Sequence, residues 1–336
     1  MTQPGPFVLR DDALASRLQV RLAVVEERLR AVVAASDGLI ESTSRHLVDA
    51  GGKRLRPLLT LLVAEMGPSA QDERVVDGAT VVELTHLATL YHDDVMDDAP
   101  VRRGAPAAHE VWGNSVAILT GDLLFAKASK LAAGLGREAL VLQADTFVRL
   151  CTGQVHETVG PAAGEDPVAH YLQVLADKTA SLIATSARYG AMLAGCPRDV
   201  VDAVGRFGER IGVAFQLADD VIDLTSNSAV TGKTPGTDLR EGVPTMPVLL
   251  LRARAAGSDG TAEDRALVGL LDGDLTSDAA LAEAVAALRV HPVVAETRAL
   301  AGAHARAAVA ELDALPDGPV KAALVDFSDA VVDRSA

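Results

Sequence analysis

The chain has 336 residues, of which 49% are hydrophobic and 3% aromatic, so it is long and apolar enough to bury a large core. Its formal net charge of −15 argues against binding to nucleic acid, which requires a basic footprint. The two cysteines, Cys151 and Cys196, provide no disulfide framework. Together with the lack of an N-terminal signal pattern and of an uncharged apolar run of membrane-spanning length, they predict a cytoplasmic protein without a transmembrane segment.

Apolar residues recur every three or four positions along most of the chain, which predicts helices. The clearest patterns cover 20–34, 138–155, 172–193, 200–224 and 293–315. Gly and Pro lie at their edges, convincing alternating strand patterns are absent from the sequence, and no Pro/Gly/Ser-rich linker separates two halves. We therefore predict a single all-α domain over residues 1–336, with roughly the first ten residues flexible.

The first basic segment reads Lys53-Arg54-Leu55-Arg56-Pro57 and follows the pair Gly51-Gly52. Lys53 and Arg56 are three residues apart, so they converge on one ligand if a helix begins here. On its own, such a pair is most often an ordinary solvated surface. His86 lies farther along an apolar stretch, and a lone histidine there is most often a satisfied core residue.

Two aspartate clusters of the form DDxxD are the strongest indication of function in the sequence. They are Asp93-Asp94-Val95-Met96-Asp97 and Asp219-Asp220-Val221-Ile222-Asp223. On a helix, residues four apart share a face, so the first and last aspartates of each cluster approach one another and repel. Carboxylate oxygens without a nearby cysteine favour Mg²⁺. One such cluster is explained equally well by a solvated acidic face. Two copies, both flanked by apolar residues, indicate metal binding.

Further cations accompany the aspartate clusters. Arg102-Arg103-Gly104 follows the first cluster, and Lys178 and Lys233 lie on either side of the second along the sequence. Arginine offers a fork of donors to phosphate, and lysine offers a compact charge. Carboxylates suited to Mg²⁺ together with these cations indicate two diphosphates, one held through metal and one held directly.

In their order and spacing, these motifs resemble the all-trans polyprenyl diphosphate synthases. The resemblance runs from Gly51-Gly52-Lys53 through both aspartate clusters to Gly232-Lys233. It implies an isoprenoid-synthase-type helical bundle around a deep central cavity, usually homodimeric. It also implies three Mg²⁺ ions that bridge an allylic diphosphate to both clusters, and a head-to-tail, all-trans condensation of that substrate with isopentenyl diphosphate.

The resemblance also implies roles for individual residues. The metal ligands are Asp93, Asp94, Asp97, Asp219, Asp220 and Asp223. The isopentenyl diphosphate pocket is formed by Lys53, Arg56, His86 and Arg103. The allylic diphosphate is contacted by Arg102, Lys178, Thr179, Gln216 and Lys233, of which Lys178, Thr179 and Gln216 also act in catalysis. Val243 stands where the family often has lysine, so that phosphate contact is missing or replaced.

Product length depends on the residues behind Asp93 on the same predicted helix, along which the tail of the product grows. Successive turns offer no aromatic side chain at the positions Ala88, Thr89, Thr85 and Val82. This favours a long-chain polyprenyl diphosphate, such as a quinone side-chain precursor, with a peripheral membrane contact for its release. In the alternative, Phe125 or Phe147 from another helix closes the cavity sooner, and the product is farnesyl or geranylgeranyl diphosphate.

Three other classes of protein share part of this pattern. A non-catalytic regulatory subunit of a two-component synthase usually lacks the aspartates that are intact here. A terpene cyclase normally mixes Asn, Ser and Glu in its second metal motif. A metal-dependent phosphohydrolase, suggested by the pair His92-Asp93, needs additional histidine ligands and gives no role to the second aspartate cluster. The polar segment 226–238 is a candidate lid over the site.

Overall fold

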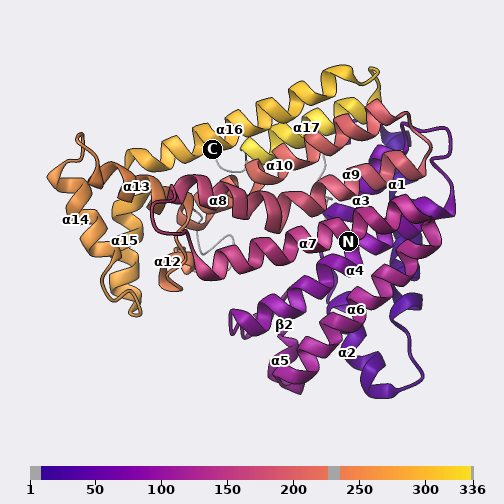
Figure 1. Ribbon diagram of the computed structural model, residues 1–336, viewed down its shortest axis with the longest axis horizontal. Coiled ribbons are helices and arrows are strands. Elements are labelled where there is room, and N and C mark those ends of the chain that lie inside the picture. The colour runs from indigo at the N-terminus through magenta and orange to yellow at the C-terminus, as the bar shows by residue number, and fades with distance from the viewer. Residues whose placement is uncertain (1–8, 226–234, 334–336) are drawn as a thin grey trace. The chain divides into compact units, whose positions relative to one another are not determined.

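The computed structural model describes residues 9–225 and 235–333, and nearly all of the regular structure in these ranges is helical (Figure 1). The first half contains α1 (Asp12–Val33), α2 (Gly38–Asp49), α3 (Leu55–Ala64), α4 (Glu73–Met96), α5 (Ala108–Trp112), α6 (Asn114–Leu135) and α7 (Arg137–Val159). It continues with α8 (Pro167–Leu175), the π-helical turn η1 (Ala176–Ala180), α9 (Ser181–Leu193) and α10 (Arg198–Thr225). The remainder is α12 (Thr237–Arg240), α13 (Met246–Ala256), α14 (Ala262–Leu271), α15 (Asp278–Arg289), α16 (Pro292–Glu311), the 3₁₀ turn η2 (Leu312–Ala314) and α17 (Pro319–Asp333). The predicted all-α fold is confirmed.

Two local features depart from the helix pattern read from the sequence. The predicted helix over 172–193 is divided by the π-helical turn η1. A small hairpin, β1 (Val101–Arg102) and β2 (Ala105–Pro106), follows α4. Its loop residues Arg103 and Gly104 have φ angles of 55° and 80°, as a two-residue type I′ turn requires. Strands of two residues are too short to show alternation, so this hairpin could not be predicted from the hydrophobic pattern.

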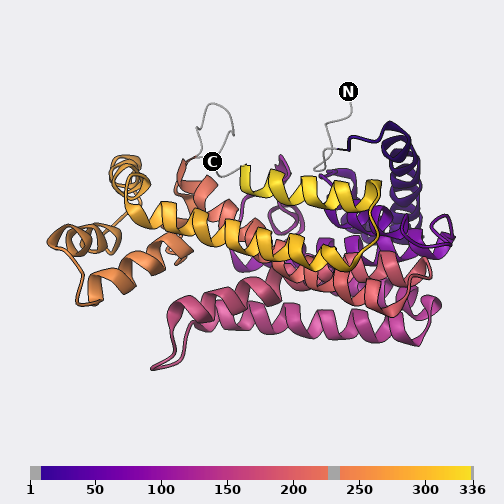
Figure 2. The same cartoon turned by 90° about the horizontal axis from the view of Figure 1, so that it is seen from above.

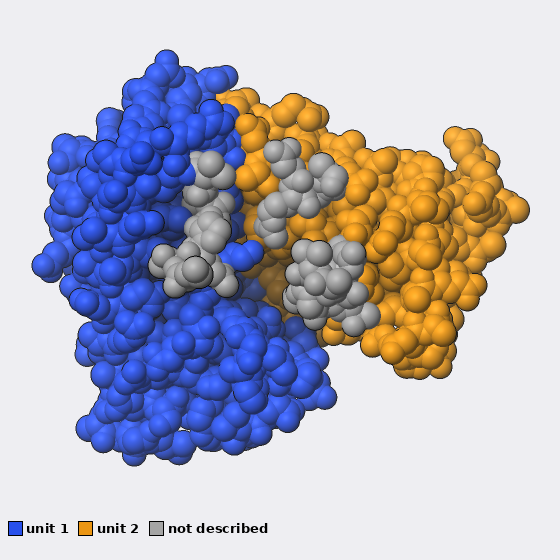
Figure 3. Space-filling model, turned by 180° about the vertical axis from the view of Figure 1, so that it is seen from behind, with its two compact units in different colours: residues 1–150, 181–208, 311–327 blue, residues 151–180, 209–310, 328–336 orange. Residues whose placement is uncertain are grey.

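Residue contacts divide the chain into two compact units (Figure 3). Unit 1 comprises 1–150, 181–208 and 311–327, and unit 2 comprises 151–180, 209–310 and 328–336. The single-domain organisation and the central cavity remain predictions. The flexibility predicted for the first ten residues falls mostly on 1–8, outside the described residues, whereas Arg10 pairs with Asp326 at 2.8 Å.

The core of unit 1 is built around α4, which packs against α6, α3 and α9. Leu84 and Leu87 of α4 are fully buried, and each contributes about 1.5–3 kcal/mol from burial. Close approach of α6 depends on Gly121, where an added Cβ would lie 2.3 Å from Nε2 of His92. This packing fixes the part of α4 that carries the first aspartate cluster.

Unit 2 has two apolar clusters. In one, α13, α14 and α15 pack together (Figures 1 and 2), with Leu251, Leu281 and Leu288 buried among them. In the other, Ala180 of η1, Leu217 of α10 and Met246 of α13 come together. The second cluster fixes the turn that carries Lys178 relative to the helix that carries the second aspartate motif. Among the described helices, none is both long and apolar enough to cross a bilayer.

Candidate active site

The first aspartate motif lies at the C-terminal end of α4. Asp93 and Asp94 belong to the last helical turn, whereas Asp97 is the C-cap and donates its N–H to the carbonyl of Asp93 at 2.8 Å. The motif therefore spans the helix end and does not lie wholly inside the helix. Carboxylates are disfavoured there because the C-terminal end of a helix dipole is negative. The position increases the need for cations around this motif.

Asp94 is the buried member of the first motif. It has no exposed surface, and its Oδ1 accepts a hydrogen bond of 2.5 Å from Nε of Arg102. Burial raises the pKa of the Asp94 carboxyl, and the charge of Arg102 opposes that shift. Oδ2 is buried and accepts no hydrogen bond from any residue that the structure describes. One carboxylate oxygen is thus used to hold Arg102, while the other has capacity for a further ligand.

The other carboxylates of the first motif are more accessible. Asp93 is half-buried, and Asp97 is exposed. Such a set of hard oxygen donors, with room for water, fits a divalent cation of the Mg²⁺ type. Among the described residues, one group of three side chains has its possible ligand atoms within 4.8 Å of one another. It consists of Asp98, His109 and Glu110. None of these belongs to the predicted set of metal ligands.

A cationic cluster occupies the same unit as the first motif. His86 lies two turns before Asp93 on α4, and burial and the charge of Arg56 lower its pKa well below the usual range. The imidazole is therefore neutral at pH 7. Burial lowers the pKa of Arg56 to about 10, and its Nε is buried without a hydrogen bond to any described residue. Lys53 is exposed beside this cluster in the sequence.

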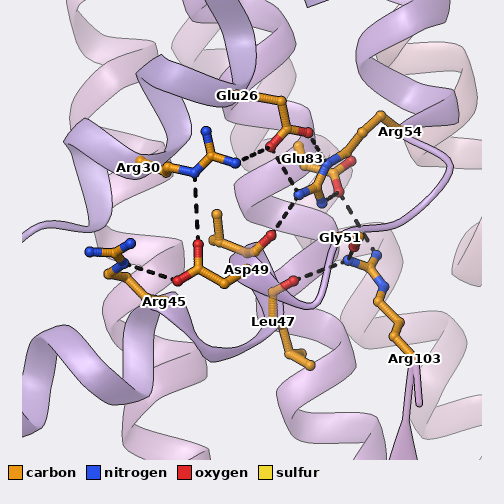
Figure 4. Close-up of polar contacts among 10 residues, drawn as sticks. Glu26, Arg30, Arg45, Leu47, Asp49, Gly51, Arg54, Glu83 and Arg103 are labelled. Atoms are coloured by element: carbon orange, nitrogen blue, oxygen red, sulfur yellow. Dashed lines mark hydrogen bonds and ion pairs between the residues drawn. The ribbon is translucent and has the colours of Figure 1, made fainter. Parts of the chain in front are cut away.

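Arg103 is held against the glycine pair that precedes α3. Its Nη1 donates to the carbonyl of Leu47 at 3.2 Å and also to the carbonyl of Gly51 (Figure 4). Gly52 makes this possible because a Cβ at that position would lie 2.8 Å from Cζ of Arg103. The pair Gly51-Gly52 therefore binds the guanidinium group of Arg103, in addition to separating α2 from α3.

The second aspartate motif lies in α10, close to its C-terminal end at Thr225. Asp220 is buried and accepts hydrogen bonds of 3.0 Å from the Tyr171 hydroxyl and from the Met246 N–H. Burial raises the pKa of Asp220 to about 8. Asp219 and Asp223 are half-buried. Both motifs thus share one pattern, in which the second aspartate is buried and hydrogen-bonded while the first and last are more accessible.

Lys178 and Thr179 lie on the π-helical turn η1, a kind of turn that is frequent at functional sites. Nζ of Lys178 forms a short ion pair with Glu157 of α7. Gln216 is half-buried on α10, one turn before Asp220. Val243 is half-buried, and its N–H donates to the carbonyl of Asp238 at 2.8 Å.

In unit 1, His86 lies close enough to Arg56, Arg102 and Arg103 for their charges to lower its pKa, and Arg102 pairs with Asp94 of the first motif. In unit 2, the turn η1, which carries Lys178 and Thr179, and the helix α10, which carries Gln216 and the second motif, meet in one apolar cluster. Lys233 and most of the candidate lid fall on 226–234, outside the described residues. The ligand assigned to each residue remains a prediction.

Four residues near these groups were missed from the sequence: Arg54, Glu83, Glu157 and Tyr171. Arg54 and Glu83 are buried partners of the cationic cluster, whereas Glu157 and Tyr171 hold Lys178 and Asp220. Glu83 left a usable signal, since it is an isolated acid in the apolar run before His86. The other three carried none, because their partners are distant in sequence.

The positions assigned to product length lie in the packed interior of unit 1. Val82, Thr85 and Ala88 are buried, whereas Thr89 is half-buried and its hydroxyl donates to the carbonyl of His86 at 2.8 Å. The aromatic residues of the alternative also meet, since the ring centroids of Phe125 and Phe147 are 4.1 Å apart. These positions are compatible with both interpretations of product length, the one based on α4 and the one based on the two phenylalanines.

Comparison with known proteins places the chain in a family. The family described as Polyprenyl synthetase matches residues 37–288, and the chain belongs to this family of prenyl-transferring enzymes. It is 44% identical to a nonaprenyl diphosphate synthase of Mycobacterium tuberculosis over 326 residues, which cover 97% of this chain and 96% of the relative.

Solved structures agree with this placement. A geranylgeranyl pyrophosphate synthase from Corynebacterium glutamicum, crystallised with calcium and isoprenyl diphosphate, has a TM-score of 0.86 and 40% identity, covering 97% of this chain and 99% of that chain. A decaprenyl diphosphate synthase from Rhodobacter capsulatus has a TM-score of 0.83 and 33% identity, with the same coverage of both chains. The isoprenoid-synthase-type helical fold is confirmed.

Proposed function

We propose that this protein is a Mg²⁺-dependent polyprenyl diphosphate synthase that condenses isopentenyl diphosphate with an allylic diphosphate, head to tail and all-trans. The observation that carries the proposal is the matched pair of aspartate motifs, each with one buried, anchored carboxylate and more accessible outer carboxylates. A cationic cluster accompanies the first motif. Acidic and basic groups of this kind suit a reaction in which two diphosphates are bound at once.

Each group of residues has a distinct part in this reaction. Asp93, Asp97 and Asp219 would hold three Mg²⁺ ions, with Asp94, Asp220 and Asp223 completing or orienting their shells. Bound Mg²⁺ supplies electrostatic stabilisation of the leaving diphosphate. Arg102, Lys178 and Lys233 would contact the same diphosphate, so that the allylic C–O bond breaks and its electron pair stays with the leaving group.

The second substrate then reacts with the allylic cation. Lys53, Arg56, His86 and Arg103 would hold isopentenyl diphosphate so that its double bond attacks the cation, and transfer of a proton from the resulting cation to the released diphosphate completes the step. Thr179 and Gln216 would stabilise the cation through their dipoles. Water must be excluded, because it would convert the cation to an alcohol.

A long-chain product, such as a quinone side-chain precursor, is the proposed end point. It is supported by the likeness to nonaprenyl and decaprenyl diphosphate synthases and by the series of non-aromatic residues behind Asp93. A shorter product is the second candidate. The contact between Phe125 and Phe147 and the likeness to a geranylgeranyl pyrophosphate synthase favour it.

We also propose that the protein is a homodimer in the cytoplasm. Helices α6 and α7 expose large apolar side chains, among them Leu119 and Val148, of which 65% and 64% are accessible, and a second copy would cover them. Both cysteines are free thiols, which suits a reducing compartment. Light scattering should give twice the chain mass for the wild type and a smaller mass for Leu119→Glu. Peripheral membrane contact for product release remains a prediction.

The function is tested by incubating the purified protein with Mg²⁺, labelled isopentenyl diphosphate and a series of allylic primers, followed by sizing of the products. Long prenyl diphosphates that form only with Mg²⁺ are expected. Cyclic hydrocarbons formed without isopentenyl diphosphate would support a terpene cyclase, and phosphate release without elongation would support a phosphohydrolase. Activity that appears only after a second protein is added would support the regulatory subunit.

A further inference from the structure

The segment Lys53-Arg54-Leu55-Arg56 contains three cations, but the middle one is used differently from the other two. Arg54 is 5% exposed and has a φ of 46°, in the left-handed region that favours glycine. The described chain has two other non-glycine residues with positive φ, Asp98 and Arg103. A left-handed arginine at the start of α3 is a strained arrangement, and the surrounding contacts must hold it in place.

Those contacts involve all three nitrogens of the Arg54 guanidinium group. Nε lies 2.5 Å from Oε1 of Glu26 on α1, Nη1 lies 2.7 Å from Oε1 of Glu83 on α4, and Nη2 donates to the carbonyl of Val48 on α2 at 2.8 Å (Figure 4). Arg54 therefore ties the start of α3 to three other helices. Because all three of its guanidinium nitrogens already have partners, Arg54 is not a diphosphate ligand. Lys53 and Arg56 are the residues of this segment that are predicted to bind the diphosphate.

Glu83 connects Arg54 to the predicted isopentenyl diphosphate pocket. It is 1% exposed and lies one turn before His86 on α4. The same Oε1 that accepts from Arg54 lies 3.9 Å from Nη2 of Arg103 (Figure 4). The charge of Glu83 also opposes the lowering of the pKa that burial imposes on Arg56 and Arg103. One buried carboxylate thus acts on three arginines.

Charge balance explains why such a carboxylate is needed. Arg54, Arg56 and Arg103 are at least partly buried close to one another, and like charges in a region of low dielectric repel strongly. Glu26 and Glu83 supply two negative charges against these three positive ones. The surplus positive charge can still attract a diphosphate, while the cluster does not have to disperse when no substrate is bound.

We propose that Glu83 is a positioning residue for the isopentenyl diphosphate pocket, acting with Arg54 to hold Arg103 and Arg56 in place before the substrate arrives. This inference rests on the proposed function, because it takes the arginines to be ligands of that substrate. Glu83 itself does not touch the substrate. It acts only through the guanidinium groups that it orients.

The test is the variant Glu83→Gln, which keeps the size of the side chain and removes its charge. The KM for isopentenyl diphosphate should rise about 30-fold or more, the lower end of the loss expected when one partner of a buried, hydrogen-bonded charge pair is removed. The KM for the allylic substrate should change little. A purely structural defect would affect both substrates alike, so this difference distinguishes positioning from damage to the fold. Glu83→Asp, which keeps the charge, should recover part of the affinity.

Asp49→Asn is the matched control. Asp49 pairs with Arg45 and Arg30 in the same region, but its side chain is 45% exposed and it makes no contact with Arg54 (Figure 4). Both KM values should stay unchanged in this variant. If Glu83→Gln does not fold, Glu26→Gln removes the outer partner of Arg54, and a smaller rise in the KM for isopentenyl diphosphate is expected.

Direct titration with isopentenyl diphosphate alone separates this inference from the proposed function. Binding needs no turnover, so Glu83→Gln should bind more weakly than the wild type even if the wild type fails to elongate a primer. If the wild type binds and elongates while the variant keeps its affinity, or gains affinity through loss of a repulsive charge, the role of Glu83 is overturned and the proposed function stands. An equal rise in both KM values would also overturn it.

Discussion

Asp94, which is buried, and Arg102, whose side chain is 31% exposed, form an ion pair with 2.5 Å between Oδ1 and Nε that joins the last turn of α4 to strand β1. The pair places a predicted diphosphate contact against the first aspartate motif. One oxygen of the buried second aspartate thus holds Arg102, while the aspartates on either side of it, Asp93 and Asp97, are more accessible.

The accessible aspartates should therefore be the sensitive ones. Asp97→Asn should lower kcat/KM by at least about 10²-fold, comparable to the loss of one electrostatic contact to a transition state. It should also raise the Mg²⁺ concentration needed for half-maximal rate. Asp12 is the control, since it is exposed at the start of α1 and belongs neither to the predicted metal ligands nor to the group of Asp98, His109 and Glu110. Asp12→Asn should stay within about twofold of the wild type, and equal losses in both variants would contradict the assignment.

Gly52→Ala should weaken binding of isopentenyl diphosphate. The new Cβ would lie 2.8 Å from Cζ of Arg103 and would displace that guanidinium group. A rise of about tenfold in the KM for isopentenyl diphosphate is expected, the effect of losing one charge-assisted contact. Gly51→Ala is the control, because a Cβ there meets nothing within 4 Å although its φ is also positive. It should cost stability in thermal unfolding without a comparable change in KM.

Thr89→Phe should shorten the product. Thr89 is half-buried, whereas Ala88 is fully buried, so a large ring is accommodated more readily at Thr89. The ring would block the path proposed for the tail, and chromatography of dephosphorylated products should show a shift to shorter chains. Thr89→Ser should leave chain length unchanged. An unaltered product from a folded Thr89→Phe variant would contradict the proposed path.

Phe125→Ala tests the alternative in which Phe125 or Phe147 closes the cavity and limits the length of the product. Phe125 is buried against Phe147, with ring centroids 4.1 Å apart, and its loss should cost about 3–5 kcal/mol of folding stability. If the aromatic pair limits chain length, the remaining active enzyme should make longer products than the wild type. We expect the same chain length, because the proposed path runs along α4.

The stability of unit 2 should depend on pH through Asp264. Its carboxylate accepts hydrogen bonds from the N–H and hydroxyl of Thr261 at 2.7 and 2.8 Å and lies 2.9 Å from Nε2 of His291, and these hydrogen bonds lower its pKa to about 2. A lowered pKa stabilises the folded state above the unfolded value of about 3.9, and this stabilisation is lost as the pH falls through about 2.

Asp264→Asn removes the charge and should lower the melting temperature near neutral pH. The difference from the wild type should shrink as the pH falls from about 5 towards about 2. Asp259→Asn, at an exposed position in the preceding loop, serves as the control. A difference between Asp264→Asn and the wild type that is independent of pH would show that lost packing, and not the titration of Asp264, is responsible.

Local pattern was sufficient to predict the all-α fold class, the two aspartate motifs and the family. Helical periodicity and motif spacing are properties of neighbouring residues, so they can be read without a structure. Five of the aspartates were correctly placed within helices, whereas Asp97 proved to be a C-cap. Helix ends depend on capping by groups that periodicity does not reveal.

Only the tertiary structure decided which charged residues are available for ligands and which hold the others. Arg54 and Arg56 are the same residue type two positions apart, yet all three guanidinium nitrogens of Arg54 are engaged by Glu26, Glu83 and Val48. Likewise, Asp94 and Asp220 differ from their neighbouring aspartates through Arg102, Tyr171 and Met246. These partners come from distant parts of the chain. The sequence therefore determined which charged groups the chain carries, and long-range packing determined which of them are buried and paired.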